Sequence, residues 1–193
     1  SIALKPDYAE TYSNKGNVLK DQGKTEKAIE AYKKAISFKP DFAEAYNNIG
    51  VTLQIQGKID DAIEAYTKSI SLKSNYPEAY SNIGNLLKKQ GRLEEAIEVH
   101  KKSISLIPNY AKAYCNMGDI LTEQGKIEEA MEALNKAVLL NPEYAEAYNN
   151  LGIALKKQNN FEKAIKAYKR AISLQCDYAE AYSNMGNVFT DQG

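Results

Sequence analysis

The stretch AYSNIGN, from Ala79 to Asn85, has five close copies elsewhere in this chain of 193 residues. The other copies read TYSNKGN, AYNNIGV, AYCNMGD, AYNNLGI and AYSNMGN. The fourth residue of every copy is asparagine: Asn14, Asn48, Asn82, Asn116, Asn150 and Asn184. Asparagine is a poor helix former, so its recurrence within a helical pattern calls for a physical reason.

The copies belong to an internal repeat with a period of 34 residues, which is the first feature to seek in a sequence. The glycine that follows each asparagine keeps this step: Gly16, Gly50, Gly84, Gly118, Gly152 and Gly186. The period predicts one array over residues 1–193. Its parts are the tail of a preceding repeat at 1–8, five repeats at 9–42, 43–76, 77–110, 111–144 and 145–178, and the first helix of a sixth at 179–193.

Each repeat is predicted to form two antiparallel helices. In the third repeat, apolar residues follow helical spacing twice: Tyr80, Ile83, Gly84 and Leu87, then Leu93, Ala96, Ile97, His100 and Ile104. Gly91 lies between the two stripes and suits the left-handed conformation that ends a helix, and Asn159 takes that place in the fifth repeat. Because one helix pair cannot bury its apolar face alone, the repeats must stack. The predicted fold class is an all-α solenoid of helix pairs.

The helix ends also carry signals. An Asp or Asn followed three residues later by Glu predicts a capping box before four first helices: Asp7 with Glu10, Asp41 with Glu44, Asn75 with Glu78, and Asp177 with Glu180. Proline is predicted to stop three second helices, at Pro40, Pro108 and Pro142.

The repeat pattern resembles the tetratricopeptide repeat. In the third repeat the matching residues are Tyr80, Ile83, Gly84, Leu87, Gly91, Ala96, His100, Ser103 and Pro108. The resemblance implies a right-handed superhelix whose first helices line a concave groove. The AYxNxG units are most similar to the arrays of O-linked N-acetylglucosamine transferases, and this implies an asparagine ladder that grips a peptide backbone.

Helix geometry places each asparagine on the polar face of its first helix. An amide offers both donors and an acceptor, so a row of amides can hold an extended backbone without reading its side chains. The predicted peptide-binding residues are the six row asparagines together with Asn17, Asn85 and Asp119. The alternative is that the amides bond to the neighbouring repeat. Six invariant glutamines are interpreted as turn residues with no partner role: Gln22, Gln56, Gln90, Gln124, Gln158 and Gln192.

Composition limits the partners and the compartment. Lys plus Arg and Asp plus Glu number 25 each, which argues against nucleic acid or an anionic membrane as the main partner. Cys115 and Cys176 match no metal or redox spacing, which favours a reducing, cytoplasmic compartment. His100 takes a packing position that is Tyr in other repeats. We expect no catalytic residues, no metal and no cofactor.

Three functions fit this pattern. The first is a scaffold that holds a protein or peptide in the groove. The second is the substrate-recognition part of a larger enzyme such as a glycosyltransferase. The third is an assembly scaffold that self-associates end to end, through terminal helices on which Met185, Val188 and Phe189 are incompletely covered.

Overall fold

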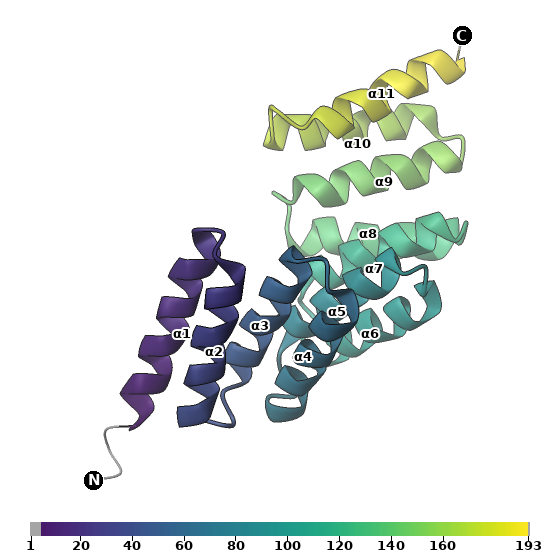
Figure 1. Ribbon diagram of the computed structural model, residues 1–193. Helices are drawn as coiled ribbons and strands as arrows, with labels where there is room; N and C mark the ends of the chain where they lie inside the picture. The colour runs from purple at the N-terminus through teal and green to yellow at the C-terminus, as the bar shows by residue number, and fades with distance from the viewer. Residues whose placement is uncertain (1–4, 193) are drawn as a thin grey trace. The chain divides into compact units, whose positions relative to one another are not determined.

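The computed structural model describes the backbone of residues 5–192 and the side chains of residues 8–190. This part of the chain forms eleven helices and no strand, as predicted (Figure 1). Their bounds are α1 Lys5–Asp21, α2 Thr25–Phe38, α3 Ala43–Ile55, α4 Ile59–Leu72, α5 Pro77–Lys89, α6 Leu93–Leu106, α7 Ala111–Glu123, α8 Ile127–Leu140, α9 Ala145–Lys157, α10 Phe161–Leu174 and α11 Ala179–Gln192.

The chain divides into two compact units, residues 1–86 and 87–193. In the first unit, α1 packs against α2, α2 against α3, and α3 against α4. In the second unit, each helix from α6 to α11 packs against the next, and α7 also contacts α9. Within each unit the helices therefore form the stacked antiparallel pairs that the repeat predicts.

Interior glycines set the distance between the helices of a pair. A Cβ atom added at Gly50 would lie 2.7 Å from the ring of Tyr66, and one at Gly152 would lie 2.5 Å from the ring of Tyr168. Both contacts are too short for real atoms. A glycine here costs about 1 kcal/mol of helix propensity, and the close approach of a buried tyrosine explains why it is present.

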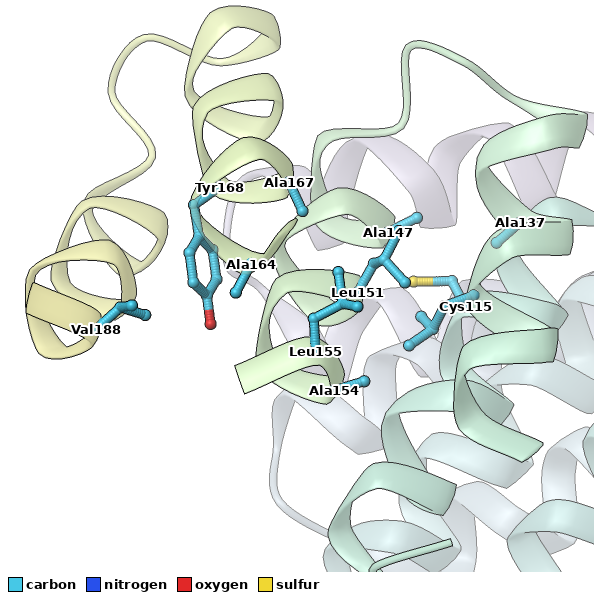
Figure 2. Packing of buried hydrophobic residues seen from close by; sticks show 11 residues of the cluster. Cys115, Ala137, Ala147, Leu151, Ala154, Leu155, Ala164, Ala167, Tyr168 and Val188 are labelled. Carbon is cyan, nitrogen blue, oxygen red and sulfur yellow. The ribbon is translucent and has the colours of Figure 1, made fainter. Parts of the chain in front are cut away.

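The core of the second unit is built from small and branched residues of several helices. Cys115, Leu134, Leu151, Leu155 and Tyr168 are all less than a tenth exposed and belong to one cluster. Figure 2 shows Tyr168 and Val188 on the side of this cluster that α10 and α11 form, with Cys115 and Ala137 on the opposite side. Val188 is 0% exposed, so the prediction that this residue is incompletely covered was wrong.

The helix ends confirm some predictions and correct others. Gly91 has a φ of 73° and Asn159 a φ of 61°, so both adopt the predicted left-handed conformation. The second helices end at Phe38, Leu106 and Leu140, each two residues before a proline. The capping box predicted before α3 was wrong. α3 begins after Phe42 and has no side-chain cap, because the turn bonds through backbone groups, including Ala43 N–H to the Asp41 carbonyl.

The start of α1 also differs from the prediction. α1 begins at Lys5, so residues 5–8 belong to this helix, and Asp7 lies inside the helix instead of capping it. The tail predicted for residues 1–4 lies outside the described residues, as does the turn role predicted for the side chain of Gln192.

Candidate functional site

The asparagine row is not equally exposed along the chain. Asn14 is exposed, and three members are half-buried: Asn48, Asn82 and Asn184. Asn116 and Asn150 are buried, with 9% and 8% of their surface accessible. Position in the repeat alone predicts equal exposure, so the neighbouring side chains must decide how far each amide reaches the surface.

In the first unit, the row amide of one repeat bonds to the preceding repeat. The Nδ2 group of Asn48 on α3 donates to the Oδ1 atom of Asn17 on α1, at 3.3 Å. The same Oδ1 atom accepts from the hydroxyl of Tyr32 at 2.8 Å. Asn17, a predicted ligand residue, therefore links two successive repeats.

The second unit contains a longer chain of bonds of the same kind. Asn184 on α11 donates through Nδ2 to Oδ1 of Asn149 on α9, at 3.1 Å. Asn149 in turn donates to Oε1 of Glu180 at 3.2 Å. Asn150 donates to the sulfur of Cys115 on α7, at 3.5 Å. Bonding to the neighbouring repeat was the alternative interpretation of the row. Three row asparagines form such bonds: Asn48, Asn150 and Asn184.

The acceptor lies either 31 or 35 residues before the donor, which are two places one helical turn apart on the preceding first helix. Asn48 finds Asn17 at the nearer place. Asn184 meets the apolar Ile153 at that place and bonds one turn further back. Asn150 meets Asp119 there, and Asp119 is already bound to Lys88. In these three cases the residue at the nearer place accounts for the acceptor, but Asn116 has Asn85 at that place and its Nδ2 group has no partner within the described residues.

Asp119, the last predicted ligand residue in the second unit, is held in an ionic cluster. The Nζ group of Lys88 contacts Oδ2 of Asp119 and lies 3.4 Å from Oε2 of Glu123. Burial alone would lower the pKa of Lys88, but the hydrogen bonds and charges of Asp119 and Glu123 outweigh burial and raise the pKa. The carboxylate of Asp119 is thus partly neutralised by a lysine before any ligand binds.

The glutamine at the end of the first helix does more than shape the turn. Nε2 of Gln56 donates to Oγ1 of Thr25 at 3.0 Å and to Oε1 of Glu26 at 3.1 Å. Gln124 donates in the same way to Glu94, at 3.0 Å. The acceptors belong to the second helix of the preceding repeat, so these two glutamines, interpreted as turn residues with no role toward a binding partner, also link successive repeats.

Asn149, which accepts from Asn184 and donates to Glu180, was not among the predicted site residues. One signal was present in the sequence. The residue before the row asparagine is Ser in three repeats, but it is Asn in AYNNIGV and AYNNLGI. Asn47 and Asn149 are both buried, but the linking bonds are those of Asn149, whereas the Oδ1 atom of Asn47 has no partner within the described residues.

The side chains with reactive chemistry are placed as packing groups. Burial raises the pKa of the Cys115 thiol to about 12, so a thiolate does not form there near neutral pH. Burial lowers the pKa of His100 to about 4, and neither ring nitrogen has a hydrogen-bond partner within the described residues. Among residues 8–190 no group of His, Cys, Asp and Glu is arranged to hold a metal ion. None of the described helices is long and apolar enough to cross a bilayer.

Comparison with known proteins agrees with this architecture. A family model described as TPR repeat matches residues 16–57, 53–91, 118–159 and 154–193, and a model described as tetratricopeptide repeat matches 75–138. A search of curated protein sequences found no significant match.

Solved structures share the fold. A crystal structure of MamA protein is 28% identical, with a TM-score of 0.72, over 90% of this chain and 95% of that one. YrrB, described as a TPR protein with an unusual peptide-binding site, is 24% identical with a TM-score of 0.68 over 89% of both chains. The pilF protein of Pseudomonas aeruginosa is 23% identical with a TM-score of 0.83, over 97% of this chain and 87% of that one. The last two likenesses concern the fold alone.

Proposed function

Because the chain belongs to the tetratricopeptide repeat family, we propose that it is a scaffold that binds an extended peptide segment of a partner protein along the polar face of its first helices. The unusual peptide-binding site described for YrrB belongs to that protein, but it supports a binding role for a chain of the same fold.

The observation that carries this proposal is the geometry of Asn48. Its amide uses one N–H group on Asn17, yet the side chain stays partly exposed. An amide has two N–H groups and a carbonyl oxygen with two lone pairs, so one N–H group and the oxygen have chemical capacity for a ligand. The bond to Asn17 fixes the amide in one orientation, which lowers the entropy cost of binding a peptide backbone.

The proposed ligand contacts include fewer asparagines than the predicted row does. Asn116 and Asn150 are less than a tenth exposed, so we assign them to packing between repeats. The ligand contacts are then assigned to the more exposed members within each unit: Asn14, Asn48 and Asn82, with Asn85 as a half-buried neighbour, in the first unit, and Asn184 in the second. Asn17 and Asp119 support the site by holding Asn48 and Lys88.

The test starts with selection of binding peptides from a random twelve-residue library displayed on phage, followed by calorimetric titration of one selected peptide. Asn82→Ala should weaken a peptide that the first unit binds, and Asn184→Ala a peptide that the second unit binds, each about two- to tenfold, the range expected for one hydrogen bond of about 0.5–1.5 kcal/mol. Asn150→Ala is the matched control, and it should lower stability while leaving the affinity of the folded protein unchanged. The proposal is refuted if the folded Asn82→Ala and Asn184→Ala variants bind the peptide as tightly as the folded Asn150→Ala control does.

Self-association is a second candidate, and the outer face of α11 favours it. Tyr182 is 48% exposed and Phe189 is 54% exposed, and a Cβ atom added at Gly186 would meet nothing within 4 Å. Exposed aromatic groups beside a small residue are typical of a surface that another helix covers. Light scattering of the wild type and of Phe189→Ser over a range of concentrations tests this candidate, since a mass that stays monomeric for both proteins contradicts it.

A cytoplasmic location belongs to the same proposal. Cys115 and Cys176 are free thiols, and Cys176 is exposed. An exposed free thiol is compatible with a reducing compartment.

A further inference from the structure

Each unit contains an apolar groove that the asparagine row does not explain. The groove of the first unit, about 760 Å³ in volume, lies among α2, α3 and α4, and we name it the Tyr46 groove. The groove of the second unit, about 560 Å³, lies among α6, α7 and α8, and we name it the Tyr114 groove. Their linings correspond residue by residue at a shift of 68, which is two repeats: Tyr46 with Tyr114, Ile49 with Met117, and Leu53 with Leu121.

The grooves open because the second helices of successive repeats stand apart. α7 packs against α9, whereas α6 and α8 make no comparable contact among the described residues. Side chains of α7 therefore form the floor of a gap between α6 and α8. At 100° per residue, Tyr46, Ile49 and Leu53 lie on the side of α3 opposite Asn48. The grooves are thus separate from the proposed peptide face.

The rim of each groove carries charge. Asp61 and Glu64 of α4 line the Tyr46 groove, and Glu129 and Glu132 line the Tyr114 groove. Neither Asp61 nor Glu64 forms a salt bridge within the described residues. Lysines also stand at the rim, so the net charge is balanced and cannot by itself select a ligand.

The place that corresponds to the two grooves one repeat further on, among α8, α9 and α10, shows which group packs against the tyrosine there, Tyr148. There the guanidinium of Arg170 lies 5.8 Å from the ring centroid of Tyr148, and its Nη2 group donates to the Pro142 carbonyl at 3.2 Å. Lysines, Lys163 and Lys166, stand where the open grooves have carboxylates. At the place of Arg170 the two open grooves have the lysines Lys68 and Lys136, and unlike the third position they also retain the acids.

We propose that the Tyr46 and Tyr114 grooves each bind an arginine side chain of a partner protein, together with the aliphatic residues beside it. The face of a tyrosine ring is negative and attracts a cation, and the carboxylates of α4 or α8 pair with the same guanidinium. The apolar floor binds the flanking aliphatic groups. Each volume is large enough for a few side chains but not for a whole helix, so the ligand is a short segment.

The experiment is an NMR titration of the whole isotope-labelled chain with a capped pentapeptide, Ser-Leu-Arg-Leu-Ser. Saturable shifts should appear at Ile49 and Leu53 and at the equivalent Met117 and Leu121. Leu151 and Leu155, which hold the same places beside Tyr148, are the internal control and should not move. Replacing the arginine with citrulline, which has the same shape and no charge, should weaken binding about tenfold.

A paired variant tests the carboxylates inside one molecule. Asp61→Asn with Glu64→Gln changes two exposed side chains, so the fold should be retained. Binding at the Tyr46 groove should weaken about threefold, as expected for exposed charge pairs, while the Tyr114 groove keeps its affinity. The proposal is overturned by an absence of saturable shifts, by equal binding of the citrulline peptide or of a glutamate peptide, by equal shifts beside Tyr148, or by shifts confined to the asparagine face.

Discussion

Replacing Gly152 with alanine should destabilise the protein, although alanine is the better helix former. The added Cβ atom would lie 2.5 Å from Cε1 of Tyr168, whose side chain is 0% exposed and has no space into which to withdraw. Overpacking of this kind costs about 1–3 kcal/mol, and the gain in helix propensity of about 1 kcal/mol offsets only part of it. We therefore expect a net loss of up to about 2 kcal/mol.

Gly186 provides the matched control, because it is the same residue at the same place in its repeat. A Cβ atom there meets nothing within 4 Å. Gly186→Ala should therefore stabilise the protein by about 0.5–1 kcal/mol through propensity alone. The two variants, which make the same chemical change, should differ by about 2 kcal/mol with opposite signs.

Urea denaturation followed by circular dichroism at 222 nm measures both variants. A difference of this size corresponds to about 4–8 °C in Tm for a chain of this length. If Gly152→Ala is as stable as Gly186→Ala, the close approach of Tyr168 does not explain the recurrent glycine. A double variant that adds Tyr168→Leu should recover little of the loss, because a Cβ atom added at Gly118 comes just as close, at 2.5 Å, to its leucine partner Leu134.

Three further outcomes follow from the described contacts. Because burial lowers the pKa of His100 to about 4 from an unfolded value of 6.5, the unfolded chain binds a proton that the folded chain does not, so the free energy of unfolding should fall by about 3 kcal/mol as the pH drops from 6.5 to 4. Urea midpoints of wild type and His100→Tyr across this range check it, and parallel curves would contradict it. Asn48→Ala should lower the free energy of unfolding by about 1 kcal/mol, because its hydrogen bond to Asn17 is lost. Asn14 is exposed, so Asn14→Ala should be neutral or slightly stabilising in the same assay. Equal losses of stability in the two variants would argue against the bond to the preceding repeat. Asp119→Asn should lower the raised pKa of Lys88, which amine-detected NMR titration measures. The free energy of unfolding should change by less than about 1 kcal/mol, because both side chains are partly exposed. An unchanged lysine pKa would exclude the ion pair.

The repeat period fixed most of the fold in advance, because a stacked helix pair depends on spacing more than on residue identity. The stripe of Tyr80, Ile83 and Leu87, the left-handed Gly91 and Asn159, and the proline stops were all read from local pattern. The capping box predicted from Asp41 and Glu44 failed for a physical reason. The turn before α3 closes through its own backbone bonds, so Asp41 contributes its carbonyl group and not its side chain.

The candidate site was less predictable because it depends on pairs of residues from different repeats. The sequence places every row asparagine on the polar face of its helix, but exposure ranges from the open Asn14 to Asn116 and Asn150, which are less than a tenth exposed. The bond from Asn184 to Asn149 requires knowledge of which turn of α9 faces α11. The grooves beside Tyr46 and Tyr114 were not anticipated, since they depend on the gap between two second helices.

The acceptor of each row amide has a consequence for the order of the repeats. A unit that donates to an asparagine in its predecessor would meet isoleucine if it were moved behind the repeat that contains Ile153. Repeats with similar sequences therefore differ in the hydrogen bonds that they form with the preceding repeat. Shuffling or duplicating these modules would therefore change which residue accepts the row amide at the new junction, as the bonds of Asn48 to Asn17 and of Asn184 to Asn149 illustrate.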